Sequence, residues 1–276
     1  MISRLVRKFF RINNPLIHAT LLVALLAIFP VSASAKSLCD RGDQFSAIRG
    51  GGLCLATKTF NAVPNRKFQP TLVVMLHGDI SKGGPANYHT PLMLEIAQND
   101  KIVSVAIIRP GYSDKNGRKS VGSNYGRSDN YTKRNNAAIG EAISKLKKLH
   151  NAKRVVLIGH SGGAAMTGVI IGMFPGLVDK AILVSCPCNI ARWRKMKRRR
   201  PWRRSLSPSS FVGKISLSTE VVVIVGKKDR NTPPRLSIDY VASLKKRKIK
   251  AKLLILEFGE HRFKRALSRA VVWEAD

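Results

Sequence analysis

The sequence contains few acidic residues. Only 16 of its 276 residues are Asp or Glu, against 49 Lys and Arg, which gives a formal net charge of +33 at pH 7. Such an excess of cations predicts nonspecific attraction to anionic membranes and envelope polymers at low salt. Internal repeats are also absent from the sequence. Repeat architectures are therefore excluded, and the length suits a single compact domain with a sizeable core.

The amino-terminal segment lacks an apolar run long enough to cross a bilayer comfortably. Leu21–Phe29 is too short for a span, and the small residues 33–35 follow it. Four cations precede it: Arg4, Arg7, Lys8 and Arg11. We therefore expect residues 1–35 to be a signal peptide cleaved before Lys36, and the mature protein to be periplasmic or secreted. The alternative is an uncleaved segment that anchors the protein in the membrane.

Cysteine is scarce, with four residues after the expected cleavage point: Cys39, Cys54, Cys186 and Cys188. An even number in an oxidising compartment predicts structural disulfides, but three pairings are open. A redox role for the Cys186-x-Cys188 pair is the alternative. No histidine lies near that pair at a spacing typical of zinc sites, so we predict no metal site.

Short apolar runs alternate with segments that have helical periodicity. The runs are 72–76, 102–108, 154–158, 180–185, 221–225 and 251–256. In one helical segment, Ile139, Ile143 and Leu146 recur at three- and four-residue steps. Thr232 precedes Pro233 and is expected to cap another helix. This alternation predicts an α/β fold with a mostly parallel sheet and helices on both faces.

One of these runs ends in the motif G-x-S-x-G, which spans residues 159–163. A buried strand that turns sharply into a helix holds its serine in a strained conformation with the hydroxyl exposed, and glycines permit the close approach. Ser161 is therefore a candidate nucleophile. A plain turn between two core elements is the alternative reading.

Two further strand runs are followed by the partners that such a serine requires. Asp229 follows the run 221–225, and His261 follows the run that ends at 256. In this order the chain resembles the α/β-hydrolase superfamily of serine hydrolases. The resemblance implies that Ser161 is the nucleophile, His261 the base and Asp229 the acid that orients the base. It implies no cofactor.

The segment after the run 72–76 resembles the oxyanion loop of the same superfamily. It reads His77-Gly78-Asp79, and the resemblance assigns the amides of Asp79 and Gly162 to the oxyanion hole. Aspartate departs from the Gly-Gly often found there, and its carboxylate would disfavour an oxyanion unless it points away. His77 and His160 are expected to be structural, because His261 already occupies the position of the base.

Residues 187–219 occupy the position of a lid insertion in this superfamily. Nine of the thirteen residues from Arg192 to Arg204 are Lys or Arg. The run is either a solvated face whose Trp193 and Trp202 cover the active-site mouth, or a contact for anionic lipid or another polyanion. The export signal argues against nucleic acid. Tyr112, after a strand and the turn Arg-Pro-Gly, is a candidate for lining the substrate site or for an ordinary surface loop.

We therefore expect residues 36–276 to form one catalytic domain, similar to the exported bacterial hydrolases near the prolyl oligopeptidase and dienelactone hydrolase branches. The expected activity is cleavage of a carboxylic ester through a Ser-His-Asp triad and an acyl-enzyme. The expected substrate is a small-molecule or peptide acyl compound. The alternatives are a serine peptidase of the prolyl oligopeptidase type and a catalytically silent protein that binds the envelope.

Overall fold

The structure is a computed structural model that describes residues 38–41, 43–64 and 66–275. The expected signal peptide, residues 1–35, lies outside the described residues. Within the described part of the chain, no helix is both long and apolar enough to cross a membrane.

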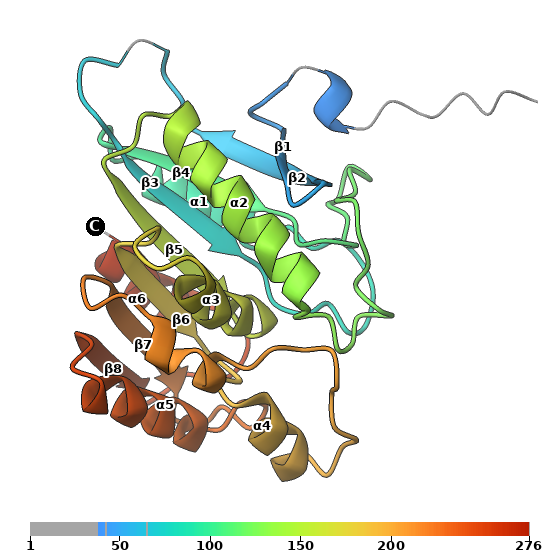
Figure 1. Cartoon of the computed structure of the whole chain (residues 1–276), viewed down its shortest axis with the longest axis vertical. Coiled ribbons are helices and arrows are strands. Elements are labelled where there is room, and N and C mark those ends of the chain that lie inside the picture. The colour runs from blue at the N-terminus through green and yellow to red at the C-terminus, as the bar shows by residue number, and fades with distance from the viewer. Residues whose placement is uncertain (1–37, 42, 65, 276) are drawn as a thin grey trace, which may run out of the picture. The chain divides into compact units, whose positions relative to one another are not determined.

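A single eight-stranded sheet forms the centre of the fold (Figure 1). Its strands are β1 (Ala47–Gly50), β2 (Leu53–Phe60), β3 (Thr71–Leu76), β4 (Ile102–Ile107), β5 (Arg154–His160), β6 (Lys180–Val184), β7 (Glu220–Gly226) and β8 (Ala251–Leu256). Their order is β1-β2-β4-β3-β5-β6-β7-β8, and β3 to β8 are all parallel. Each of the six predicted strand runs is a strand, and the predicted mostly parallel α/β fold is confirmed.

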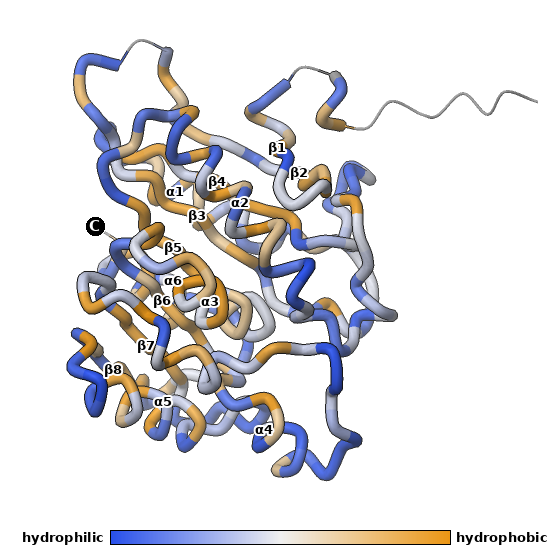
Figure 2. Tube along the Cα trace, in the orientation of Figure 1, coloured by the Kyte–Doolittle hydropathy of each residue, from blue (hydrophilic) through white to orange (hydrophobic). Residues whose placement is uncertain are grey.

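Neighbouring residues on these strands enter two different cores. On β3, Leu72 and Val74 pack in one apolar cluster, whereas Val73 and Met75 pack in the other. Strands buried on both faces read as continuous apolar runs rather than alternating ones. The hydropathy of the trace follows this pattern, with hydrophobic segments along the central strands (Figure 2).

Helices cover both faces of the sheet. They are α1 (Thr90–Ile96), α2 (Lys133–Leu149), α3 (Gly162–Met173), α4 (Ile190–Met196), α5 (Pro234–Lys246) and α6 (Arg265–Ala275). Short 3-10 turns are η1 (Leu38–Arg41), η2 (Pro208–Ser210) and η3 (Val212–Lys214). Helices α2, α3 and α5 contribute to one core, and α1 and α6 contribute to the other. On α2 the periodic residues Ile139, Ile143 and Leu146 are buried, as the spacing predicts.

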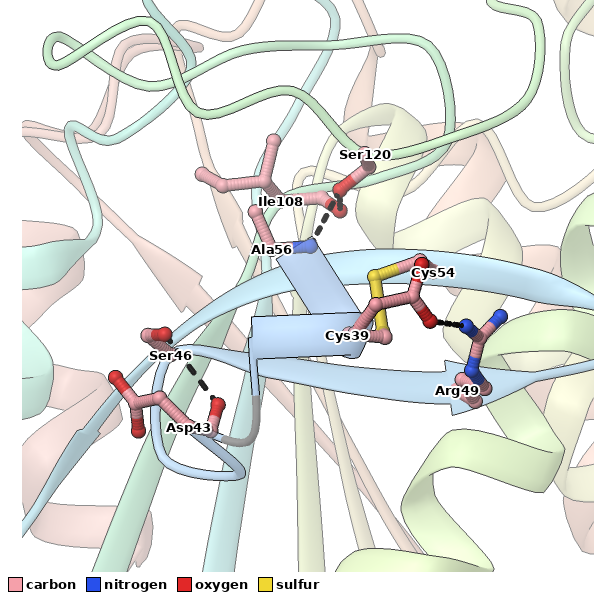
Figure 3. The surroundings of a disulfide bond; sticks show 9 residues. Cys39, Asp43, Ser46, Arg49, Cys54, Ala56, Ile108 and Ser120 are labelled. Carbon is pink, nitrogen blue, oxygen red and sulfur yellow. Dashed lines mark hydrogen bonds and ion pairs between the residues drawn. A yellow bond between two sulfur atoms is a disulfide. The ribbon is translucent and has the colours of Figure 1, made fainter. Parts of the chain in front are cut away.

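The sequence did not predict β1 and β2, which extend the sheet as antiparallel strands, β2 beside β4 and β1 at the edge beside β2. Cys39 of η1 forms a disulfide with Cys54 at the start of β2 (Figure 3). Beyond this disulfide, Ser120 Oγ accepts from the amide of Ala56 at 2.9 Å and donates to the carbonyl of Ile108 at 2.5 Å. Contacts with residues distant in sequence therefore help to hold β2 in place.

The second disulfide joins Cys186 and Cys188, which are both buried just after β6. Of the three pairings left open by the sequence, the structure thus contains Cys39–Cys54 and Cys186–Cys188. The second pair precedes α4, so it lies at the beginning of the segment expected to form a lid.

Candidate active site

Ser161 lies at the sharp turn between β5 and α3. Its backbone has φ 52° and ψ −115°, a region that residues with side chains rarely adopt. A Cβ atom at Gly159 would lie 2.4 Å from the carbonyl oxygen of Gly163, and one at Gly163 would lie 2.3 Å from that of Leu76. The motif glycines therefore allow strand and helix to approach closely enough to form this turn.

The structure brings Ser161, His261 and Asp229 together from the carboxyl ends of three strands. His261 Nε2 lies 3.0 Å from Ser161 Oγ, and His261 Nδ1 lies 2.9 Å from Asp229 Oδ2. Because the ionised carboxylate can only accept, Nδ1 carries the imidazole proton and Nε2 is free to accept from the serine hydroxyl. This geometry suits a general base acting on a nucleophile.

Asp229 is buried, yet it is well supplied with donors. Its Oδ1 accepts from the amides of Asn231 at 2.9 Å and Thr232 at 2.8 Å. Burial favours the protonated form, but the hydrogen bonds from His261 and Thr232 outweigh it and lower the pKa of Asp229 below its usual value. The carboxylate therefore remains charged at neutral pH and can stabilise a protonated His261.

Thr232 does not cap α5, contrary to the expectation from the sequence. The helix begins at Pro234, and Pro233 occupies the capping position. The Thr232 hydroxyl instead lies 2.8 Å from Asp229 Oδ2 and 3.0 Å from the Ser185 carbonyl oxygen. An aspartate often accepts hydrogen bonds from backbone amides two or three residues later in its own turn. The spacing between Asp229 and Thr232 was therefore the signal in the sequence from which this contact could have been predicted.

His160, beside the nucleophile, connects two loops of the site. Its Nε2 lies 2.9 Å from the backbone oxygen of His261, and its Nδ1 lies 2.5 Å from Tyr88 Oη. Tyr88 Oη also accepts from the amide of Gly78 at 2.6 Å. Burial, followed by the nearby His261, lowers the pKa of His160 to about 3, so the ring is neutral. Since a carbonyl only accepts, the proton of His160 is on Nε2.

His77 is also a neutral, buried structural residue. Its Nδ1 lies 2.7 Å from the carbonyl oxygen of Gly78, and its Nε2 accepts from the amide of Arg109 at 2.9 Å. Burial and the charge of Arg109 lower its pKa well below the usual value. Both ring nitrogens are therefore engaged in holding the loop after β3 against the end of β4.

The two residues assigned to the oxyanion hole come from two segments, Asp79 from the loop after β3 and Gly162 from the start of α3. Gly162 provides the first amide of α3, where helix amides have no partner within the helix. The carboxylate of Asp79 is held by Arg109 Nη2 at 3.0 Å and by the hydroxyl of Tyr131 at 2.5 Å. Burial and Asp79 raise the pKa of Tyr131 well above its usual value, so this phenol remains a donor. The Asp79 charge is thus balanced by Arg109.

Tyr112 is only 2% exposed and does not line the cavity in front of Ser161. Its ring packs edge-on against His77 at 4.9 Å between centroids, and its hydroxyl lies 3.4 Å from Asp79 Oδ1. The prediction that Tyr112 lines the substrate site is therefore corrected. Tyr112 contacts Asp79 from outside the cavity. The polar loop that follows Tyr112 had suggested exposure, whereas the ring folds inward.

A cavity of about 400 Å³ opens in front of Ser161 and His261. The other lining residues are Asp79, Ser81, Gly126, Arg127, Ser128, Trp193, Arg194, Arg199, Trp202 and Asn231. Trp193 and Trp202, both expected near the substrate, pack edge-on at 5.2 Å between ring centroids. Trp193 Nε1 donates to the carbonyl of Asn231 at 2.8 Å, and Asn231 Nδ2 lies 3.0 Å from His261 Nε2. Asn231, which the sequence did not single out, thus connects the tryptophans with the base.

The basic run begins on α4, and its segment after the helix is largely hydrophilic (Figure 2). Local contacts hold several parts of this run. Arg192 forms an ion pair with Asp239, and Lys197 Nζ donates to the carbonyl of Arg230 at 3.0 Å. Asp129 accepts from the amides of Arg203, Arg204 and Ser205. Some residues of the run, such as Arg194 and Arg199, therefore line the cavity, while other cations of the run, such as Lys195 and Arg198, are exposed.

Comparison with known proteins yields one family and many similar folds. A sequence profile of the prolyl oligopeptidase family matches residues 97–276. No curated protein matches the chain.

Among solved structures, Est1E from Butyrivibrio proteoclasticus with bound ferulic acid is 17% identical, with a TM-score of 0.65, over 83% of this chain and 97% of that one. An esterase of Pyrococcus furiosus is 13% identical, with a TM-score of 0.63, over 87% of this chain and 92% of that one. An acylaminoacyl peptidase of Pyrococcus horikoshii is 16% identical, with a TM-score of 0.63, over 83% of this chain but only 39% of its own. At these identities the likenesses show a shared fold.

Proposed function

The chain belongs to the prolyl oligopeptidase family, and from this premise we propose that it is an exported serine hydrolase that cleaves a carboxylic ester. The observation that carries the proposal is the contact of His261 Nε2 with Ser161 Oγ at 3.0 Å, with Asp229 2.9 Å from the opposite ring nitrogen. A charged, hydrogen-bonded carboxylate that orients an imidazole toward a serine is the arrangement that activates the serine hydroxyl.

The proposed reaction has two steps, acylation of Ser161 and hydrolysis of the acyl-enzyme. Ser161 Oγ attacks the ester carbonyl while its proton passes to His261 Nε2, and the amides of Gly162 and Asp79 stabilise the resulting oxyanion. The intermediate then collapses, and His261 gives this proton to the departing alkoxide. The alkoxide leaves as an alcohol, and the acyl group remains on Ser161 as an acyl-enzyme. Water repeats the sequence: its proton passes to His261, its oxygen attacks the acyl carbon, and the proton returns to Ser161. The product is a carboxylic acid, and no cofactor takes part.

Peptide bond cleavage is the second candidate, because the same groups would protonate an amine leaving group. The share of each similar structure that this chain covers favours ester cleavage over peptide cleavage. This chain spans 97% of the Butyrivibrio esterase but 39% of the acylaminoacyl peptidase. The cavity of about 400 Å³ also suits a small substrate better than an extended peptide.

We also propose that residues 1–35 direct export, and that the cationic outer face of the basic run contacts an anionic membrane or envelope polymer. The exposed cations of that face include Lys195, Arg198, Arg200 and Arg203. Tryptophan beside clustered cations is typical of segments that bind anionic interfaces. The alternative of a silent envelope-binding protein would need this face but not the triad.

An uncharged fluorophosphonate probe with purified mature protein tests the proposal. We expect labelling of the wild type and of Ser243→Ala, an exposed serine on α5, and none of Ser161→Ala. In a panel of neutral esters and peptide amides, Ser161→Ala should lose several orders of magnitude in kcat/KM, since only oxyanion and binding contributions, roughly 10³- to 10⁴-fold over water, remain. An unlabelled wild type would favour the silent binder, and preferential cleavage of amides would favour the peptidase.

A further inference from the structure

Three arginine residues line the cavity that contains Ser161. Arg127 comes from the loop before α2, Arg194 from α4, and Arg199 from the segment after α4. They therefore reach one cavity from separate positions in the sequence.

No carboxylate in the described part of the chain forms an ion pair with Arg127, Arg194 or Arg199. The acidic residue on the cavity wall, Asp79, is already balanced by Arg109. Asp129, close to the basic run, uses both carboxylate oxygens for backbone amides of residues 203–205. The cavity thus carries an excess of positive charge beside the nucleophile.

Two of the three guanidinium groups are held in place without neutralisation. Arg127 Nη1 donates to the carbonyl of Ile80 at 2.7 Å. Arg194 Nε donates to the carbonyl of Arg200 at 2.8 Å, and its guanidinium lies 4.8 Å from the Trp202 ring centroid. Each retains further N–H donors, because a guanidinium has five.

Arg194 and Arg199 are also close enough to repel each other. Burial and the charge of Arg199 together lower the pKa of Arg194. Like charges placed together cost free energy, and a bound anion between them would relieve that cost. Guanidinium groups match the paired oxygens of carboxylates and phosphates, to which they donate bidentate hydrogen bonds.

We propose that the substrate is an anionic ester, which carries a carboxylate or phosphate that Arg199, Arg194 and Arg127 bind while Ser161 attacks the ester carbonyl. This inference rests on the proposed function. Trp193 and Trp202 supply the apolar wall for the rest of the substrate. A cavity of about 400 Å³ accommodates both groups of a small ester at once.

Matched pairs of esters test the inference and locate the anion. For the acyl side, para-nitrophenyl hemiglutarate is compared with para-nitrophenyl pentanoate. For the leaving-group side, para-butanoyloxybenzoate is compared with its methyl ester, and para-butanoyloxyphenyl phosphate with its dimethyl ester. In at least one pair, kcat/KM should be about tenfold higher or more for the anionic ester, as expected for charge-assisted hydrogen bonds. The measurement at about 0.5 M salt removes long-range attraction by the whole protein.

A matched pair of variants assigns this preference to the cavity. Arg199 and Arg203 are both exposed residues of the basic run, but only Arg199 lines the cavity. Arg199→Gln should lower the ratio of kcat/KM for the anionic over the neutral ester by about tenfold. Arg203→Gln should leave the ratio as in the wild type, and Arg199→Lys should restore part of it.

Labelling by the uncharged fluorophosphonate separates the two proposals. A labelled enzyme that shows no preference in any ester pair, or equal losses in Arg199→Gln and Arg203→Gln, overturns the anionic substrate while the serine hydrolase stands. An unlabelled enzyme overturns both.

Discussion

The hydroxyl of Thr232 lies 2.8 Å from Asp229 Oδ2, the same carboxylate oxygen that pairs with His261 Nδ1. It also lies 3.2 Å from that ring nitrogen. One small side chain therefore fixes both the acid and the base of the triad, and it does so from a position that is fully buried.

Thr232→Val keeps the shape of this side chain but removes its hydroxyl. We expect kcat to fall about tenfold with little change in KM, because Asp229 loses a charge-assisted hydrogen bond of about 1.5–3 kcal/mol. Thr232→Ser should recover most of the activity. The acidic limb of the pH profile of kcat/KM should move in Thr232→Val, and an unmoved profile would reduce Thr232 to a packing residue.

Asp229→Asn should cost far more, roughly 10⁴-fold in kcat, as the loss of an orienting carboxylate favours the wrong histidine tautomer. Asp239→Asn is the matched control, since Asp239 lies on α5 and pairs with Arg192 and Arg235 rather than with the triad. Its kcat/KM for a neutral ester should stay within a few-fold of the wild type. The reverse order of effects would mean that another residue supplies the acid.

Three buried histidines predict a loss of stability in mild acid. Burial lowers the pKa of His89 to about 4 and, with His261, that of His160 to about 3, and His77 lies well below its usual value. In the unfolded chain each would take up a proton near pH 6.5, roughly the reference value, whereas the folded state would not. The depressed pKa values therefore contribute stability that is complete above about pH 6.5 and is lost as the pH falls toward 4 and 3.

The free energy of unfolding in urea, measured at several pH values from neutral to about pH 5, should fall by about 4 kcal/mol per pH unit at its steepest if all three contribute. His89→Leu removes one titrating group and should reduce this slope by about a third. A stability independent of pH over this window would show that these rings take up protons in the folded state as readily as in the unfolded state.

The outer face of the basic run should govern binding to anionic vesicles. Simultaneous replacement of Lys195, Arg198 and Arg200 by Ser should weaken sedimentation with phosphatidylserine vesicles by about 3 kcal/mol, at roughly 1 kcal/mol for each charge. The same charge loss on α2, with Lys145, Lys147 and Lys148 replaced by Ser, serves as the control. Equal weakening by both variants would assign the attraction to net charge alone, and no weakening would make the run a solvated face.

The sequence predicted the central strands well because each is buried on both faces. A strand buried on both faces needs apolar residues at every position, as in the run 221–225. Such a run can be recognised from a few consecutive residues, without knowledge of the rest of the fold. Ser161, Asp229 and His261 could be nominated for a related reason, since each follows a parallel strand within a few residues and parallel strands bring their carboxyl ends to one edge.

The groups that support the triad were not predictable in this way. Tyr88 and His160 are 72 residues apart, and Arg109 and Asp79 are 30 apart, so no spacing rule connects them. Tyr112 and Thr232 carried local signals of an exposed loop and a helix cap, and tertiary contacts overrode both. Of the cations that line the cavity, Arg194 and Arg199 were hidden within a run whose overall charge suggested a surface, and Arg127 lies in a loop far from that run in the sequence.

The chain of contacts from the His261 backbone oxygen through His160 and Tyr88 to the amide of Gly78 has a mechanical consequence. It links the loop that carries His261 to the loop after β3 that carries Gly78 and Asp79, through the residue next to Ser161. A displacement of any one of these loops would have to break one of these hydrogen bonds. These hydrogen bonds therefore hold His261, Ser161 and the loop after β3 in a fixed relation, so that a substrate would meet these groups already in place rather than assembling them on arrival.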